Sequence, residues 1–302
     1  TIDSTTRLVS FEEGGMTDVA SLPTEAGSLS TASVAAGPSG ATLVLSHVRL
    51  DQWNGTNHAV DFAAYGVLPA DGGATFVPKW TQRGAGGMPT GPFPAFITGE
   101  AEPKLITAQG HDGRPGMLNG VAAYDLATGE ELWRAPVYVG QGVGPLAVAD
   151  LNGDGVTDAM GGMMGDVAGV PTLPPAPEIV AIDGRTGEIM WRRVDAIGKF
   201  RPLRLATADL DGDSHPEVVA TLVQRDGTTC GSGQDDQGAV GIYDGVTGAQ
   251  ECRLPTDRPV WSVAAVEAPG ARGQTLVAPA LGGTVYGFQH AEPGCGLLSA
   301  GP

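Results

Sequence analysis

The chain of 302 residues has little positive charge and no long hydrophobic run. No apolar stretch approaches the roughly 20 residues that a membrane-spanning helix needs, so we expect no transmembrane segment. Lys and Arg number 17 against 34 Asp and Glu, which gives a formal net charge of −17. Because no cluster of basic residues is visible, the sequence offers no basic face to nucleic acid or to an anionic membrane surface. We therefore expect no nucleic-acid partner.

Cysteine is also scarce. Cys230, Cys252 and Cys295 are too few for a disulfide scaffold, and their spacing fits no zinc site. Their odd number allows one bridge and one remaining thiol. The Cys230–Cys252 pairing is favoured, and a bridge from Cys295 to either of the other two stays open.

Catalytic signatures are missing as well, since the sequence has no GxSxG, no HExxH and no phosphate-binding glycine loop. The first ten residues, TIDSTTRLVS, lack the basic start and apolar stretch of a signal peptide. They are compatible with the new end that is left after a signal peptide has been removed.

Three segments repeat an apolar–Asp pair, a Thr-Gly turn and a stretch that ends in Trp-Arg or Cys-Arg. They are residues 124–134 (YDLATGEELWR), 182–192 (IDGRTGEIMWR) and 243–253 (YDGVTGAQECR). The runs on both sides of each turn alternate with period two, as half-buried strands do. An Asp-x-x-Thr-Gly turn between two such runs predicts a hairpin. Because Trp133 and Trp191 recur at one repeat position, we expect them to pack between repeats.

A second element repeats in phase with these hairpins. Residues 146–160 read LAVADLNGDGVTDAM and residues 205–220 read LATADLDGDSHPEVVA. A third copy, residues 263–278, has lost its acids, and residues 96–107 and 34–45 are degenerate copies. Each unit reads strand, acidic loop, strand, long variable loop, strand, Thr-Gly turn, strand.

Four antiparallel strands per unit of about 60 residues are typical of a β-propeller blade, which must stack on its neighbours. The sequence therefore predicts an all-β propeller of about five four-stranded blades over residues 34–302. Residues 1–33 are predicted to form an N-terminal segment, partly linker. Its residues 7–11 (RLVSF) are expected to close the ring as the fourth strand of the last blade, which is predicted to supply only three strands of its own.

The acidic loops have oxygen-bearing residues at alternating positions. The first loop offers Asp150, Asn152, Asp154, Val156 and Asp158, and the second offers Asp209, Asp211, Asp213, His215 and Glu217. Val156 and His215 would contribute backbone carbonyls. Such a set suits Ca²⁺, which takes six to eight oxygen ligands, and we expect two structural Ca²⁺ sites. The second loop has more carboxylates, so we expect it to bind more tightly. An EF-hand is excluded because Gly161 and Ala220 stand where its final Glu would be.

The acidic-loop segments resemble FG-GAP (VCBS-type) repeats, the calcium-loop repeats of integrin α-chain propellers and of many secreted bacterial proteins. The Thr-Gly hairpins resemble quinoprotein-like propeller repeats. The resemblance implies calcium as a structural brace, an extracytoplasmic location, and a non-catalytic role in adhesion, protein binding or scaffolding. A protein or glycan ligand at one rim, or a place as a subunit of an envelope assembly, is expected. The third copy departs from the pattern at Glu267, Pro269 and Ala271, so its blade should be metal-free.

An enzyme on a propeller scaffold is the alternative, either a quinoprotein dehydrogenase or a calcium-dependent polysaccharide lyase. Dehydrogenases of this type have a vicinal disulfide, and no two cysteines are adjacent here. A lyase needs a base such as Lys or His beside a metal-bound uronate. The only three lysines, Lys79, Lys104 and Lys199, have no telling context. The sequence assigns no catalytic residue.

Overall fold

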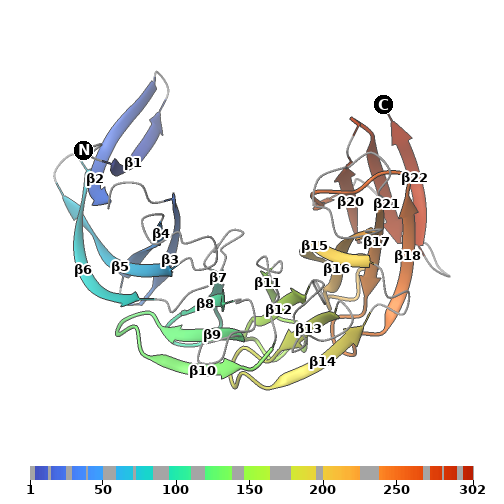
Figure 1. Cartoon of the computed structure of the whole chain (residues 1–302), viewed down its shortest axis with the longest axis horizontal. Helices are drawn as coiled ribbons and strands as arrows, with labels where there is room; N and C mark the ends of the chain where they lie inside the picture. The colour runs from blue at the N-terminus through green and yellow to red at the C-terminus, as the bar shows by residue number, and fades with distance from the viewer. Residues whose placement is uncertain are drawn as a thin grey trace.

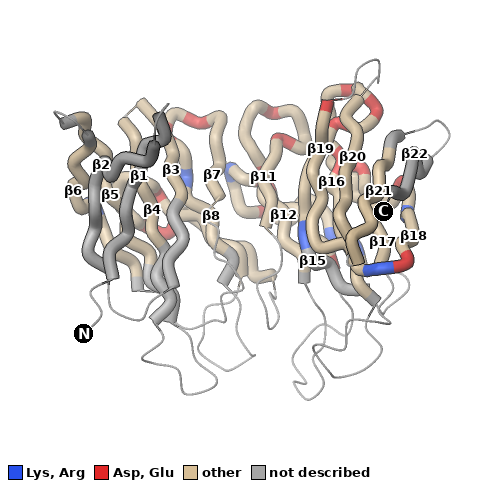
Figure 2. Tube along the Cα trace, turned by 90° about the horizontal axis from the view of Figure 1, so that it is seen from above, with Lys and Arg blue, Asp and Glu red and all other residues tan. Residues whose placement is uncertain are grey.

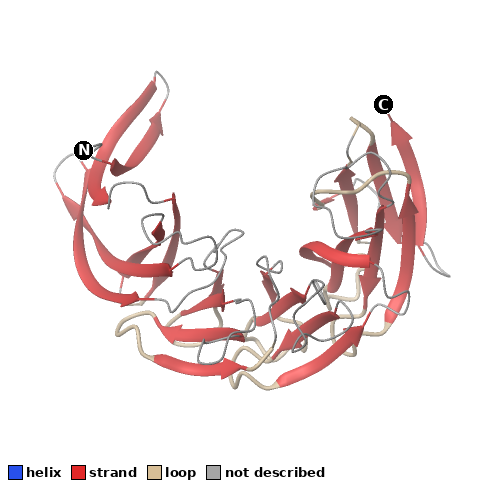
Figure 3. Ribbon diagram, in the orientation of Figure 1, coloured by secondary structure: helices blue, strands red, loops and turns tan. Residues whose placement is uncertain are grey.

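The structure, a computed structural model, is built from β-strands. The residues that it describes are 4–12, 15–24, 29–38, 40–49, 59–70, 73–83, 95–109, 120–137, 146–163, 178–194, 200–224, 238–267, 273–280, 282–290 and 295–301. In these ranges no residue is helical (Figure 3), and accordingly no helix there is suited to crossing a membrane.

The strands form five four-stranded antiparallel sheets within the described ranges, and we call each of these sheets a blade. An N-terminal hairpin, β1 (Ser4–Glu12) with β2 (Gly15–Thr24), precedes them. Blade 1 contains β3 (Leu29–Gly37), β4 (Gly40–Arg49), β5 (Ala59–Ala70) and β6 (Gly73–Arg83). Blade 2 contains β7 (Ala95–Ile97), β8 (Lys104–Gln109), β9 (Gly120–Asp125) and β10 (Glu131–Ala135). The first sheet thus begins at Leu29, inside the predicted N-terminal segment.

The remaining blades follow the same plan, with strands paired in chain order. Blade 3 contains β11 (Leu146–Ala149), β12 (Asp158–Met163), β13 (Glu178–Ile182) and β14 (Ile189–Val194). Blade 4 contains β15 (Phe200–Ala208), β16 (Glu217–Gln224), β17 (Gly238–Tyr243) and β18 (Gln250–Thr256). Blade 5 contains β19 (Ala264–Glu267), β20 (Gln274–Pro279), β21 (Val285–His290) and β22 (Cys295–Gly301).

The blades follow one another along an arc, as propeller blades do (Figure 1). The first strands of blades 2, 3 and 4 lie on its concave side and the last strands on its convex side. Contacts between β7 and β11, between β11 and β15 and between β15 and β19 join neighbouring blades along the concave side. The arc is open between the N-terminal hairpin and blade 5.

The predicted ring closure by residues 7–11 is wrong for the described strands. These residues lie in β1, and β1 pairs only with β2. The fourth strand of blade 5 is instead β22, which pairs antiparallel with β21. A strand that follows β21 after a short connection loses less chain entropy on pairing than one that must come from the other end of the chain.

The three Thr-Gly hairpins are confirmed as β9–β10, β13–β14 and β17–β18. In each turn, the Asp carboxylate accepts hydrogen bonds from the amide and the hydroxyl of the Thr three residues on. At Asp125, Oδ1 accepts the amides of Ala127 and Thr128 and the Thr128 hydroxyl, at 2.7–3.0 Å. Burial opposes ionisation of Asp125, but these bonds outweigh it and lower its pKa.

Each Thr-Gly turn is also the docking point for a tryptophan of the preceding blade. Trp80, Trp133 and Trp191 donate their indole N–H to the carbonyls of Leu126, Gly184 and Gly245, at 3.0, 3.1 and 2.8 Å. A Cβ built on the turn glycine, Gly129, Gly187 or Gly248, would lie within 2.6 Å of the same indole ring. Only glycine therefore fits beneath the ring, and its positive φ completes the turn. The packing role predicted for Trp133 and Trp191 is confirmed.

The apolar cores lie between the blades. One core joins blade 2 to blade 3, with Ile97 and Ile106 packed against Val180 and Ile182. Equivalent cores join blades 1 and 2, blades 3 and 4, and blades 4 and 5. A smaller cluster with Leu43 and Leu45 lies within blade 1. Burial of apolar faces between neighbouring blades is the physical reason that such repeats fold as an array.

The turn glycine offers a clean test of this packing. We expect Gly187→Ala to destabilise the protein by roughly 2–4 kcal/mol, because it combines a strained φ of 77° with a clash against Trp133. Gly282→Ala is the matched control, since φ there is 90° but a Cβ would meet nothing within 4 Å. Urea unfolding measures both; equal losses for the two variants would contradict the docking role.

Candidate metal centre

The two acidic loops connect the first and second strands of blades 3 and 4. Loop 1 (residues 150–158) joins β11 to β12, and loop 2 (residues 209–217) joins β15 to β16. Both open at the same edge of the arc, where Figure 2 shows many of the acidic residues. The predicted positions of both loops between strands are confirmed.

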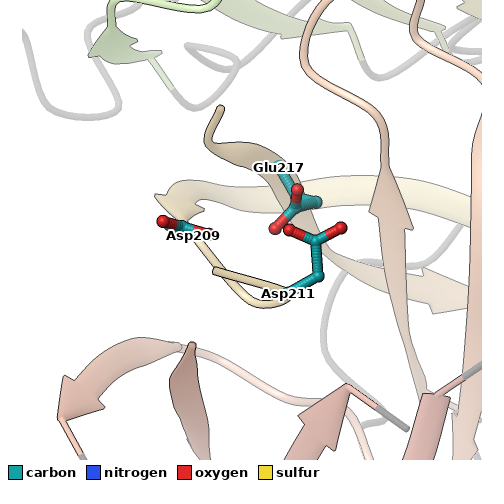
Figure 4. Close-up of side chains that lie close together, drawn as sticks. All are labelled: Asp209, Asp211 and Glu217. Atoms are coloured by element: carbon teal, nitrogen blue, oxygen red, sulfur yellow. The ribbon is translucent and has the colours of Figure 1, made fainter. Parts of the chain in front are cut away.

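Loop 2 brings three of its five predicted ligands together. Carboxylate oxygens of Asp209, Asp211 and Glu217 all lie within 4.8 Å of one another. Figure 4 shows Asp211 and Glu217 with their carboxylates facing each other and Asp209 beside them. Asp213 is not in this group, and its Oδ1 accepts the amide of His215 at 2.7 Å. The geometry thus supports Asp209, Asp211 and Glu217 as a candidate centre for a hard cation, whose preferred ligands are such oxygens.

The acidic side chains of loop 2 also fold the loop itself. Asp209 accepts the amides of Gly212 and Ser214 at 2.7 and 3.1 Å, and Asp211 accepts that of Asp213 at 3.0 Å. Ser214 takes a φ of 75°, which is uncommon for a residue with a side chain. These bonds are those of an Asx turn, and they help to set the conformation of the loop.

Glu217 is the buried member of the cluster. Its side chain is 4% exposed, and Oε2 accepts the amide of Leu210 at 2.6 Å. Burial raises its pKa to about 8, and the charge of nearby Asp211 adds to the shift, although the Leu210 bond opposes it. A divalent cation between these carboxylates would replace the lost solvation, so the residues present fit such an ion.

Loop 1 is built on the same plan, with Asp158 in the place of Glu217. Its carboxylate accepts the amides of Leu151 and Gly184 at 3.1 and 3.0 Å. Burial raises the pKa of Asp158 as well, against the effect of these two bonds. Among the described residues, loop 1 has no three acidic, His or Cys side chains whose ligand atoms lie within 4.8 Å of one another, as those of loop 2 do. Part of the reason is that Asn152 stands where loop 2 has Asp211.

A positively charged side chain lies beside loop 1. The Arg185 guanidinium is 3.7 Å from Asp154 Oδ2 and 3.9 Å from Glu100 Oε1 of blade 2. No such arginine contact is made by the loop 2 cluster within the described residues. The charge of Arg185 therefore opposes the binding of a metal ion in loop 1. It does not act in this way on loop 2.

The corresponding position in blade 2 is a lysine. Lys104 pairs with Ile97 across the strands, as Asp158 pairs with Ala149 and Glu217 with Ala208. Its ammonium is 2.7 Å from Glu100 and 3.4 Å from the carbonyl of Arg185. The side-chain ammonium of Lys104 thus supplies a fixed positive charge at the position that carries an acid in blades 3 and 4.

The loops also join neighbouring blades. Leu151 packs into the core between blades 3 and 4, Val156 into that between blades 2 and 3, and Leu210 into that between blades 4 and 5. The sequence predicts only a carbonyl ligand at position 7 of the loop, and the structure buries the Val156 side chain there. Its counterpart His215 lies against loop 1, since a Cβ on Gly153 would be 3.3 Å from its ring.

Backbone bonds reinforce these contacts. The Thr157 amide donates to the carbonyl of Thr98 in blade 2 at 3.0 Å, and the Thr98 amide donates to Thr157 Oγ1 at 2.8 Å. At the other end, the Gln274 amide of blade 5 donates to the carbonyl of Asp209 at 2.7 Å. Gln274 Oε1 accepts the Asp209 amide at 3.1 Å. Sequence reasoning missed Thr98, Thr157 and Gln274, because none of these three carries a ligand signal.

The sequence predicts that the third copy of the loop, in blade 5, binds no metal, and the structure describes only part of this loop. Glu267 accepts a hydrogen bond from Gln274 Nε2 at 3.2 Å, whereas Pro269 and Ala271 lie outside the described residues. Cys252 is disulfide-bonded. Cys230 lies outside the described residues too, so the Cys230–Cys252 pairing stays a prediction.

Comparisons with known proteins assign no family to this chain. No protein-family model matches the chain, and no curated protein matches it in sequence. The quinohemoprotein alcohol dehydrogenase from Comamonas testosteroni matches with a TM-score of 0.44 and 14% identity, over 91% of this chain and 44% of that one. The biofilm matrix protein Bap1 of V. cholerae matches with a TM-score of 0.33 and 16% identity, over 66% and 35%.

Both structural neighbours are propeller-like proteins. This chain spans less than half the length of either. At this level of similarity, no residue role is transferred from them to this chain.

The raised pKa of Glu217 predicts that, in a metal-free buffer, the protein loses stability as pH rises. This is opposite to the effect of a carboxylate whose pKa is lowered by folding. The folded state keeps a proton up to about pH 8 that the unfolded state, with a pKa near 4.5, has lost. The free energy of unfolding should therefore fall as pH rises between these values, by at most about 1.4 kcal/mol per unit. We expect Glu217→Gln to flatten this fall, and Glu188→Gln, an exposed control, to leave it unchanged.

Urea unfolding with chelator between pH 5 and 8 measures this slope. Saturating Ca²⁺ should abolish it in the unmodified protein, since a ligating carboxylate is ionised at every pH in the range. An identical slope in Glu217→Gln and in the unmodified protein would contradict the assignment.

Proposed function

We propose that the chain is an exported, non-catalytic binding or scaffold module: a β-propeller of about five blades, stabilised by two structural Ca²⁺ ions. The observation that carries the proposal is the cluster of Asp209, Asp211 and Glu217 within 4.8 Å in a loop bonded to the next blade. A cation there neutralises a buried repulsive group and holds the two blades together in one step.

The ligand chemistry supports calcium. Every side chain offered by the loops is an oxygen donor apart from His215 and Val156, for which the carbonyl is proposed. The proposed ligands are Asp150, Asn152, Asp154, Val156 and Asp158 in the first site, and Asp209, Asp211, Asp213, His215 and Glu217 in the second. Sites of modest affinity fill at the millimolar calcium levels of extracytoplasmic compartments, which supports export to the periplasm or the cell surface.

The strength of the brace follows from linkage. An ion that binds the folded state alone stabilises it by RT ln(1 + [L]/Kd), which is about 2.7 kcal/mol at a hundredfold excess over Kd. For loop 2 this stabilisation acts on a segment that contains Leu210 in the core between blades 4 and 5 and Asp209 bonded to Gln274. Chelation should therefore loosen these blades before the others.

Calorimetric titration with Ca²⁺ tests the two sites separately. We expect two sites, the tighter in loop 2, because loop 2 has one more carboxylate and lacks the arginine that faces Asp154. Asp211→Asn should weaken the tighter site. Arg185→Gln should tighten the weaker site severalfold, because even in a water-like dielectric a positive charge about 6 Å away costs a divalent ion about 1.4 kcal/mol.

Arg192→Gln serves as the control, since that arginine pairs with Glu178 and not with a loop. Equal or reversed affinities of the two loops would contradict the ligand assignment, and an unchanged weaker site in Arg185→Gln would remove the role of that arginine.

The ligand of the module is proposed to be a protein or a glycan at one rim, or a larger envelope assembly of which the chain is a subunit. A pull-down from the surface of the native cells with the whole chain, once with Ca²⁺ and once with chelator, identifies it. We expect capture that depends on calcium. A bound quinone in an absorbance scan, or calcium-dependent cleavage of uronic-acid polymers, would displace the non-catalytic proposal in favour of an enzyme.

A further inference from the structure

We call the contact surface between two neighbouring blades a seam. In the seam between blades 4 and 5, the tryptophan that docks on the turn glycine in the other seams is missing. Trp80, Trp133, Trp191 and Cys252 occupy one register position, each beside a shift in strand pairing, opposite Ala64, Ala123, Ala181 and Ile242. Three of the seams therefore have an indole ring on the turn glycine of the next blade, and the fourth has a cysteine.

Cys252 points into the seam. It packs against the core that blades 4 and 5 share, which includes Ile242 from blade 4 and Phe288 from blade 5. It is also disulfide-bonded. Its sulfur therefore needs a partner that is within reach of the interface with blade 5.

The strand register of blade 5 gives the place of Cys295. The pairing shift between Gly287 and Phe288 corresponds to the shift between Ile242 and Tyr243 in blade 4. Gln289 then corresponds to Asp244. The Asp244 amide bonds to the carbonyl of Ala249, and Gln289 pairs with Gly296.

The residue that precedes this partner is Gly248 in blade 4 and Cys295 in blade 5. Cys295 thus takes the place of the turn glycine in the docking contact. A Cβ on Gly248 would lie 2.5 Å from the Trp191 ring, so a side chain at this position is directed at the tryptophan position of the preceding blade. The strands that carry the two cysteines, β18 and β22, are in contact.

We propose that Cys252 and Cys295 form the disulfide, and that this bond replaces the tryptophan–glycine contact between blades 4 and 5. Two thiols lose two protons and two electrons as the S–S bond forms, and the oxidant is a second disulfide, which is reduced to two thiols by exchange. Cys230 is the remaining thiol.

Cys230 lies outside the described residues. It belongs to the connection between Gln224 and Gly238, the residues at which β16 ends and β17 begins. Gly238 pairs with Thr256, at the end of β18 that is remote from the Thr-Gly turn. Cys252 lies four residues away from Thr256, about 13 Å along the strand, and beside the turn.

Peptide mapping without reduction tests the pairing on the unmodified full chain, produced in an oxidising compartment. Free thiols are alkylated in denaturant before digestion, and the peptides are identified by mass spectrometry. We expect a linked peptide that contains Cys252 and Cys295, and an alkylated Cys230. A Cys230–Cys252 link, a Cys230–Cys295 link or three alkylated cysteines would overturn the proposal.

Single serine variants test the contribution of the bond to the seam. We expect Cys252→Ser and Cys295→Ser each to lower Tm by on the order of 5–10 °C, with no further loss in the double variant, because either change removes the same bond. Cys230→Ser is the matched control and should leave Tm unchanged. Reductant should lower the Tm of the unmodified protein to that of the double variant.

The same measurement can contradict the proposal. A loss in Cys230→Ser equal to that in Cys252→Ser, or additive losses in the double variant, would show that Cys252 and Cys295 do not share a bond.

Discussion

The contact between neighbouring blades is the interaction on which the rest of this structure depends. The apolar clusters lie between sheets, so Val180 of blade 3 is buried only because Ile106 of blade 2 covers it. A single four-stranded blade would expose both faces to water. Every repeated device in the sequence acts at these seams: the tryptophan on its glycine, the leucine of the acidic loop, and the backbone bonds between loops.

The acidic loops differ from ordinary turns in what they connect. Loop 1 reaches blade 2 through Thr157 and blade 4 through Leu151, and loop 2 reaches blade 5 through Asp209. Asx bonds and the bonds to neighbouring blades together shape each loop. The cost of burying the Glu217 carboxylate, with a smaller contribution from the charge of Asp211, is visible in its raised pKa. A cation would remove this cost at the point where the blades meet, and the Lys104 ammonium stands at the corresponding place in blade 2.

Much of the fold could be predicted from the sequence because the signals are local. A Thr-Gly turn between alternating runs fixes a hairpin, and Asp at positions 1 and 3 of a glycine-containing loop fixes an Asx turn. The role of Trp133 followed from its recurrence at one phase. Ring closure was not predictable in this way, since it depends on which distant edge β1 meets. β1 pairs with the adjacent β2 instead.

The parts of the site that sequence reasoning missed are contacts across seams. Arg185 and Glu100 come from different blades, and only the fold brings them beside Asp154. The same holds for Gln274 and Asp209. Periodicity shows that residues recur, but it does not show which face of the next blade they meet. The packing of the Val156 side chain at loop position 7 was missed as well, because only its carbonyl carries a ligand requirement.

Hydrogen–deuterium exchange with and without Ca²⁺ is the most direct test that loop 2 and the seam to blade 5 form one unit. The Leu210 amide bonds to Glu217 in the loop, and the Gln274 amide bonds to Asp209 across the seam. The account predicts that calcium slows exchange in peptides that cover residues 209–217 and 274–279 together, with the same calcium midpoint. Protection confined to residues 209–217, with residues 274–279 unchanged, would contradict it.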